Sequence, residues 1–188
     1  MYVASSVENV ASVVGEILAI DMMEMYSPER VIKLCSKYGL RPGCSLDLTN
    51  GFDFDKACDR ERAWQILERD QPLLVIGSPP CTAFSIWMLC INVKRMKPDD
   101  VERMLGESRM HLEFMAMIYR EQLRQMRHLL HYHPASAFSW KEKCIEDLCK
   151  DPRVHSTVCD QCQFGLLTKG DHGGERLPAM KPTRFMSS

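Results

Sequence analysis

The 188-residue sequence has no excess of charge of either sign, no long apolar run and no internal repeat. It carries 24 basic and 25 acidic side chains, so its balanced charge gives no general attraction to nucleic acid. No apolar run approaches the roughly 20 residues of a membrane-spanning helix, and we expect no membrane partner. With 45% hydrophobic residues the chain is not compositionally disordered, and its length suits a single domain over residues 1–188.

Residues 1–15 lack the basic and then apolar pattern of a secretory leader, and the nine cysteines are irregularly spaced. Both features predict an intracellular protein of the nucleus or cytoplasm rather than a disulfide framework. Cys159 and Cys162 have the spacing of a zinc or dithiol pair, and Cys144 and Cys149 complete a possible set of four ligands. Cys144 and Cys149 lie on an apolar face of a predicted helix, which argues against metal binding. We therefore keep a zinc or dithiol site only as an alternative and expect no other metal site.

Apolar periodicity predicts an α/β protein in which strands alternate with helices. That order indicates a mostly parallel sheet with right-handed crossovers and helices on both faces. Ser27-Pro28-Glu29 is typical of a helix start, and Val31, Leu34, Cys35 and Tyr38 would share its buried face. Further helix caps are expected at 98–102 and 139–142. We expect strands over 17–20, 44–48, 73–76, 128–134 and 154–159. We expect helices over 27–39, 55–69 and 98–127, and a short one that Ser139 caps and Pro152 stops.

The strand at 73–76 runs directly into Gly77-Ser78-Pro79-Pro80-Cys81. The two prolines restrict φ and have no N–H group, so this segment forms neither a helix nor a sheet ladder. Cys81 therefore follows a stiff corner at the carboxyl end of a strand, where open α/β sheets place their ligands. Cys81 is the candidate nucleophile, with Thr82 and Ser85 as loop supports.

The stretch Ser78-Pro79-Pro80-Cys81-Thr82-x-Phe84-Ser85 resembles the DNA (cytosine-5) methyltransferase family, in particular its short phage-type or retroelement-embedded members. The resemblance implies a Rossmann-like S-adenosylmethionine-dependent methyltransferase fold. Because the chain is short, we expect no room for the family's usual separate target-recognition domain. The resemblance also implies that the Cys81 thiolate adds to a cytosine extruded from DNA, so that carbon 5 accepts a methyl group from S-adenosylmethionine. The residues that would serve catalysis are Ser78, Pro80, Cys81, Thr82, Ser85 and Tyr132.

Other segments extend this resemblance in the expected order. Glu24-Met25-Tyr26-Ser27 is similar to the segment that opens the family's cofactor loop. By the same resemblance Asp47 would hold the cofactor ribose, Asp53 would approach the adenine or amine, and Ser78 would also contact the cofactor. A further resemblance is to the pair of strands near the end of the short family members. It covers Asp160-Gln161-Cys162-Gln163-Phe164-Gly165 and the later Lys181-Pro182-Thr183-Arg184. Lys181, Thr183 and Arg184 of this pair would bind DNA.

Two departures from the family pattern leave a second hypothesis open. Ser27 is followed by Pro28-Glu29-Arg30, where the family has glycines that let a ligand approach the backbone. Tyr132 stands at the place of a catalytic glutamate, with His131 and His133 beside it as substitutes or as structural histidines. The second hypothesis is a catalytically degenerate module that binds nucleic acid or a partner.

Overall fold

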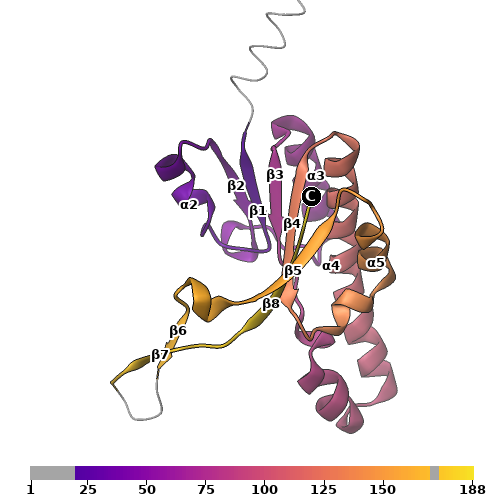
Figure 1. The fold of residues 1–188 in the computed structure, drawn as a ribbon. Helices are drawn as coiled ribbons and strands as arrows, with labels where there is room; N and C mark the ends of the chain where they lie inside the picture. The colour runs from indigo at the N-terminus through magenta and orange to yellow at the C-terminus, as the bar shows by residue number, and fades with distance from the viewer. Residues whose placement is uncertain (1–19, 170–173) are drawn as a thin grey trace, which may run out of the picture. The chain divides into compact units, whose positions relative to one another are not determined.

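The computed structural model describes residues 20–169 and 174–188, which form a mixed α/β fold (Figure 1). Its main sheet has six strands in the order β2-β1-β3-β4-β8-β5 and is mostly parallel. The predicted Rossmann-like α/β class is therefore confirmed. The chain divides into two compact units, and the division falls inside β3 (Leu74–Gly77), between Val75 and Ile76. Each unit is described by itself.

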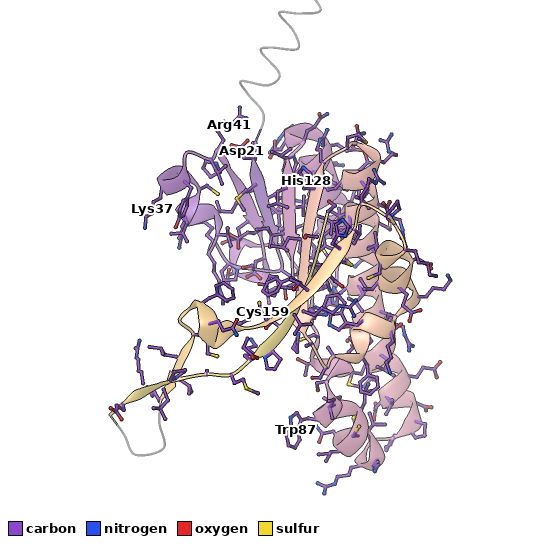
Figure 2. The ribbon with its side chains drawn as sticks, viewed as in Figure 1. Asp21, Lys37, Arg41, Trp87, His128 and Cys159 are labelled. Atoms are coloured by element: carbon purple, nitrogen blue, oxygen red, sulfur yellow. The ribbon has the colours of Figure 1, made fainter. Side chains whose placement is uncertain are left out.

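The first unit is built on the parallel pair β1 (Met22–Met25) and β2 (Pro42–Leu46). All of β1 is buried, as expected for a strand of a parallel sheet. Arg41 and Asp21 join the starts of the two strands through an ion pair of 3.0 Å between Nη2 and Oδ1 (Figure 2). This contact holds the pKa of Asp21 below its usual value. The unit also contains α2 (Ile32–Cys35) and α3 (Ala57–Asp70), with the 3₁₀ turns η1 (Ser36–Tyr38) and η2 (Leu48–Asn50).

The first helix is shorter than predicted. It begins at Ile32 rather than after Ser27, and Ile32 and Cys35 are buried whereas Leu34 and Tyr38 are exposed. Four helical residues are too few to present the single long face that the periodicity suggested. Its predicted end is confirmed, because Gly39 adopts φ 71° and closes the η1 turn. The strand predicted over 17–20 lies, except for its last residue, outside the described residues.

In the second unit, β8 (Pro182–Ser187) pairs antiparallel with both β4 (His128–Pro134) and β5 (His155–Asp160). The last strand of the chain is thus inserted between two earlier ones. A separate two-stranded sheet is formed by β6 (Leu167–Lys169) and β7 (Arg176–Pro178). Short turns are η3 (Thr82–Phe84), the π-helical η4 (Met88–Asn92), η5 (Val93–Arg95), η6 (Phe138–Lys141) and η7 (Gln161–Phe164).

Helices α4 (Pro98–Arg124) and α5 (Lys143–Cys149) cover one face of these strands (Figure 1). Met115, Ile118 and Tyr119 of α4 are fully buried, while Val101 and Met104 in its first two turns are only half-buried. Neither helix has the predicted side-chain cap at its first turn. In the described part of the chain, none of the helices combines the length and the apolar character needed to cross a membrane.

Gly77 provides a direct test of this packing. A Cβ atom added there would clash with the Cε of Met115 and the hydroxyl of Tyr119. We expect Gly77→Ala to lower the free energy of unfolding by about 1–3 kcal/mol, measured by urea denaturation. Gly106 is the matched control, because it lies exposed within α4 with nothing within 4 Å of an added Cβ. Gly106→Ala should raise the free energy of unfolding by about 0.5–1 kcal/mol, and equal effects of the two substitutions would contradict the packing.

Candidate functional site

The loop that leads from β3 to Cys81 is tied to β4 by two hydrogen bonds. The Ser78 hydroxyl donates to the carbonyl of Tyr132 at 3.0 Å. The Nε2 of His133 lies 2.7 Å from the carbonyl oxygen of Pro79. Because a carbonyl can only accept, Nε2 carries the proton and Nδ1 accepts from the Ser139 hydroxyl at 2.8 Å. β4 and η6 together therefore fix the backbone that precedes Cys81.

The two histidines of β4 are buried and neutral. Burial lowers the pKa of His133 to about 4, and the hydrogen bond to Pro79 only partly opposes this. Burial also lowers the pKa of His131 well below its usual value. The Nδ1 of His131 lies 3.2 Å from the Tyr119 hydroxyl, and its buried Nε2 has no partner among the described residues. Both ring nitrogens of His133 are engaged, so it positions the loop rather than replacing an acid.

Cys81 itself is half-buried at the start of η3. Burial raises the pKa of its thiol, whereas a backbone hydrogen bond and the positive charge of Lys181 act in the opposite direction. At neutral pH the group is therefore a thiol, and any thiolate chemistry needs added stabilisation of the anion. Thr82 is exposed and Pro80 is exposed beside it. The Ser85 hydroxyl accepts from the Met88 N–H at 3.1 Å and so supports the next turn.

Tyr132 lies on the same face of the sheet as Phe185, its partner on β8, with ring centroids 6.0 Å apart. Thr183 is buried, accepts from Gln161 Nε2 at 2.9 Å and donates to the Lys181 carbonyl at 3.1 Å. These contacts fix the start of β8, where Lys181 is exposed and acts on Cys81.

Arg184 occupies the opposite face of β8 from Thr183. Its guanidinium carbon lies 4.6 Å from the centre of the Trp140 ring, and Nη2 donates to the Ser156 hydroxyl at 3.0 Å. Of the three residues assigned to DNA by the resemblance, only Lys181 is thus brought beside Cys81. Thr183 and Arg184 hold strands together, and their role in DNA binding stays a prediction.

In the first unit, the carboxylate of Glu24 caps the beginning of α2. Oε2 accepts from the backbone N–H groups of Arg30, Val31 and Ile32 at 3.0, 2.9 and 2.8 Å, and Oε1 accepts from the Ser27 hydroxyl at 3.2 Å. A buried anion beside several unpaired helix N–H groups satisfies them and interacts favourably with the helix dipole. Glu24 therefore has a structural task in this unit.

The loop that follows β1 makes its turn without a glycine. Tyr26 adopts φ 58°, a left-handed conformation that favours glycine, and its ring centroid lies 4.6 Å from that of Phe54. Burial raises the pKa of the Tyr26 hydroxyl. Ser27 is buried, and its carbonyl accepts from the Ser45 hydroxyl. The backbone that a glycine-rich loop would open to a ligand is here packed against side chains.

Asp47 and Asp53 are less buried and cap turns. Asp47 Oδ1 accepts from the N–H and hydroxyl of Thr49 at 3.0 and 2.8 Å, and Oδ2 has no partner among the described residues. Asp53 Oδ1 accepts from the Asp55 N–H at 3.2 Å, and Oδ2 faces Lys56 Nζ at 3.2 Å. The fit to S-adenosylmethionine is thus partial. Asp47 keeps one oxygen for a ribose, and Asp53 stays half-exposed although both its oxygens have partners, whereas Glu24 and Ser27 are committed to the protein.

The structure gives no support to the zinc alternative. All nine cysteines are free thiols. Within residues 20–169 and 174–188, no three or more His, Cys, Asp or Glu side chains are grouped so that they could hold a metal ion. Cys159 and Cys162, at the end of β5 and in η7, are half-buried (Figure 2 labels Cys159).

The sequence interpretation missed two residues that support the loop. Ser139 was assigned to a helix cap, but it orients His133 instead. Tyr119 was not singled out, yet its hydroxyl lies 3.2 Å from the Gly77 carbonyl and from His131 Nδ1. His133 and Pro79 are 54 positions apart, so no local pattern could have revealed this pairing.

Comparison with known proteins does not assign this chain to a family. No protein-family model matches the chain, and no curated protein matches it. Among solved structures it is similar to a methyltransferase of Entamoeba histolytica, with 10% sequence identity and a TM-score of 0.48. The match covers 90% of this chain and 52% of the other, so the chain spans about half the length of that structure. At this identity and TM-score the likeness does not identify a function.

The structural role of Glu24 can be tested without any ligand. Glu24→Gln leaves a single acceptor oxygen, without a full negative charge, for the N–H groups that the carboxylate satisfied. We expect it to lower the free energy of unfolding by about 1–3 kcal/mol, measured by chemical denaturation. Glu29→Gln is the matched control, since Glu29 is exposed nearby and should change stability little. A stability loss as small as that of the control would show that Glu24 is not needed for the fold, and its carboxylate would then be available to bind a ligand.

The raised pKa of Cys81 predicts its pH dependence. Because alkylation proceeds through the thiolate, its rate at Cys81 should still be rising above about pH 8.5, the ordinary range of a thiol. Peptide-resolved mass spectrometry after brief iodoacetamide treatment measures this rate, with exposed Cys58 as the internal reference. Lys181→Gln should move the midpoint further upward. A Cys81 rate that levels off below pH 8 would mean that the thiolate is stabilised rather than disfavoured.

Proposed function

We propose that this chain transfers a methyl group from S-adenosylmethionine to carbon 5 of cytosine in DNA, with Cys81 as the nucleophile. The observation that carries the proposal is the loop before Cys81, which β4 holds through Ser78 and His133. A nucleophile that must meet a flipped base needs a fixed direction of attack, and this loop supplies it. The motif resemblance around Pro80 and Cys81 supports the same chemistry.

In the proposed reaction the Cys81 sulfur bonds to the ring carbon next to carbon 5, which makes carbon 5 nucleophilic. Carbon 5 then gains the methyl group and loses its proton, and elimination restores the thiolate. When bound, S-adenosylmethionine supplies the methyl group, and Asp47 and Asp53 are the residues that would hold it. Lys181 favours the thiolate of Cys81 by its charge.

Tyr132 stands where this chemistry calls for a stronger acid. A phenol hydroxyl can donate a hydrogen bond to the ring, but it is a far weaker acid than the carboxyl group expected there. His133 does not compensate, because both its nitrogens are engaged. Attack on an unprotonated cytosine ring is slower, so the proposal includes a low turnover rate.

A second candidate function is supported by the first unit. Glu24 and Ser27 are used within the protein, and the loop that follows β1 lacks glycine. These features fit a catalytically degenerate module that keeps the fold and binds nucleic acid or a protein partner. Both candidates retain the loop of Cys81, so they differ in cofactor binding and in covalent chemistry.

We expect labelled S-adenosylmethionine to transfer methyl groups to cytosine-containing DNA, and Cys81→Ser to abolish that transfer. Serine keeps nearly the same shape but is a far weaker acid and nucleophile than a thiol, so a rate loss of at least about 1,000-fold is expected. DNA that contains 5-fluorocytosine should form a covalent adduct with the parent protein alone, visible as a mass shift.

Cys90→Ser is the matched control, because Cys90 is exposed on η4 and should leave transfer unchanged. Calorimetry with S-adenosylhomocysteine separates the two candidates. Absence of transfer, adduct and cofactor binding would reject methyl transfer in favour of the degenerate module. Transfer that survives in Cys81→Ser would show that Cys81 is not the nucleophile.

A further inference from the structure

β5 forms one edge of the sheet, and its first four residues are exposed. It has 6 residues, contains neither proline nor lysine, and pairs with β8 in an unbroken register. Proteins usually protect an edge strand with such residues, with a bulge or with a covering segment. Among the described residues, no strand pairs with the outer side of β5.

The register identifies which backbone groups of β5 face outward. The Pro182 carbonyl accepts from Ala135 beside β4 at 2.9 Å, whereas the Lys181 carbonyl accepts from Gln161 on the β5 side at 3.2 Å. In an antiparallel ladder these directions alternate along the strand. Pro182, Arg184 and Met186 therefore face β4, and their partners on β5 are Asp160, Val158 and Ser156. The N–H groups of these three partners point away from β8, as do the carbonyls of Ser156 and Val158. The carbonyl of Asp160, the N-cap residue of η7, already accepts the first hydrogen bond of that turn.

We propose that this edge pairs with β5 of a second copy of the chain, antiparallel about a two-fold axis at Val158. Only outward-facing residues can exchange backbone hydrogen bonds, so Val158 faces its own copy and Ser156 faces Asp160 of the second copy. The Val158 pair exchanges two backbone hydrogen bonds and each Ser156–Asp160 pair adds one, from the Asp160 N–H, so the contact has about four. An isologous contact of this kind closes as a dimer and joins the two sheets.

The side chains at these positions are complementary in this register. Val158 is 55% exposed, and contact with its copy removes an apolar surface from water. The Ser156 hydroxyl accepts from Arg184, so its own proton is available for the Asp160 carboxylate opposite. No like charges face each other across the axis, which favours a second copy over an unrelated strand.

Sedimentation velocity over roughly 10⁻⁶ to 10⁻⁴ M protein tests the proposal. We expect a reversible monomer–dimer equilibrium, because one edge strand buries less area than a permanent interface. Val158→Lys places two charges together on the axis and should weaken the dimer at least about tenfold. Leu177→Lys is the matched control, since Leu177 is 49% exposed on β7, and should leave the equilibrium unchanged. Circular dichroism checks that both variants are folded.

Amide hydrogen exchange gives a second readout that is specific to the register. Raising the protein concentration should slow exchange at the amides of Val158 and Asp160, while Thr157 and Cys159 are already bonded to β8 and should change little. A monomer throughout the concentration range would overturn the proposal. A dimer that Val158→Lys does not weaken, or one that protects other amides instead, would also overturn it.

Discussion

The direction of Cys81 depends on one buried hydrogen bond, from His133 Nε2 to the Pro79 carbonyl. Pro79 and Pro80 have no N–H groups, so this part of the loop can be held only through its carbonyls and through Ser78. The bond requires a proton on Nε2. Burial keeps the imidazole neutral, so Nδ1 is free to accept from the Ser139 hydroxyl. The direction in which the Cys81 thiol points is therefore determined by residues of β4 and η6, and not by the loop that contains Cys81.

The burial that makes this loop rigid also disfavours the anion that the proposed chemistry needs. Desolvation raises the pKa of Cys81, and the charge of Lys181 only opposes that rise. The first unit shows a similar use of polar groups for structure, because the Glu24 carboxylate satisfies the start of α2. The rigid loop before Cys81 suits nucleophilic attack, whereas polar groups such as the Glu24 carboxylate stabilise the fold.

The insertion of β8 between β4 and β5 connects the loop with the open edge. Because directions alternate along an antiparallel strand, β8 presents Thr183 and Phe185 on one face and Arg184 on the other. Lys181 immediately precedes this strand, and its charge acts on Cys81. The same alternation turns three backbone positions of β5 outward. One strand therefore contributes to the charge at the thiol and to the surface proposed for a second copy.

The sequence by itself determined the α/β class, the bounds of β4, the helix end at Gly39 and the stiff corner before Cys81. These follow from apolar periodicity and from the restricted backbones of glycine and proline, which act locally. It misplaced the start of α2, because the group that caps this helix is Glu24 on the preceding strand rather than a neighbouring serine. Only the tertiary structure decided the pairing of His133 with Pro79, the place of β8 and the stacking of Arg184 on Trp140. Each of these joins residues far apart in the chain, and burial and strand register, which no local pattern encodes, select the partners.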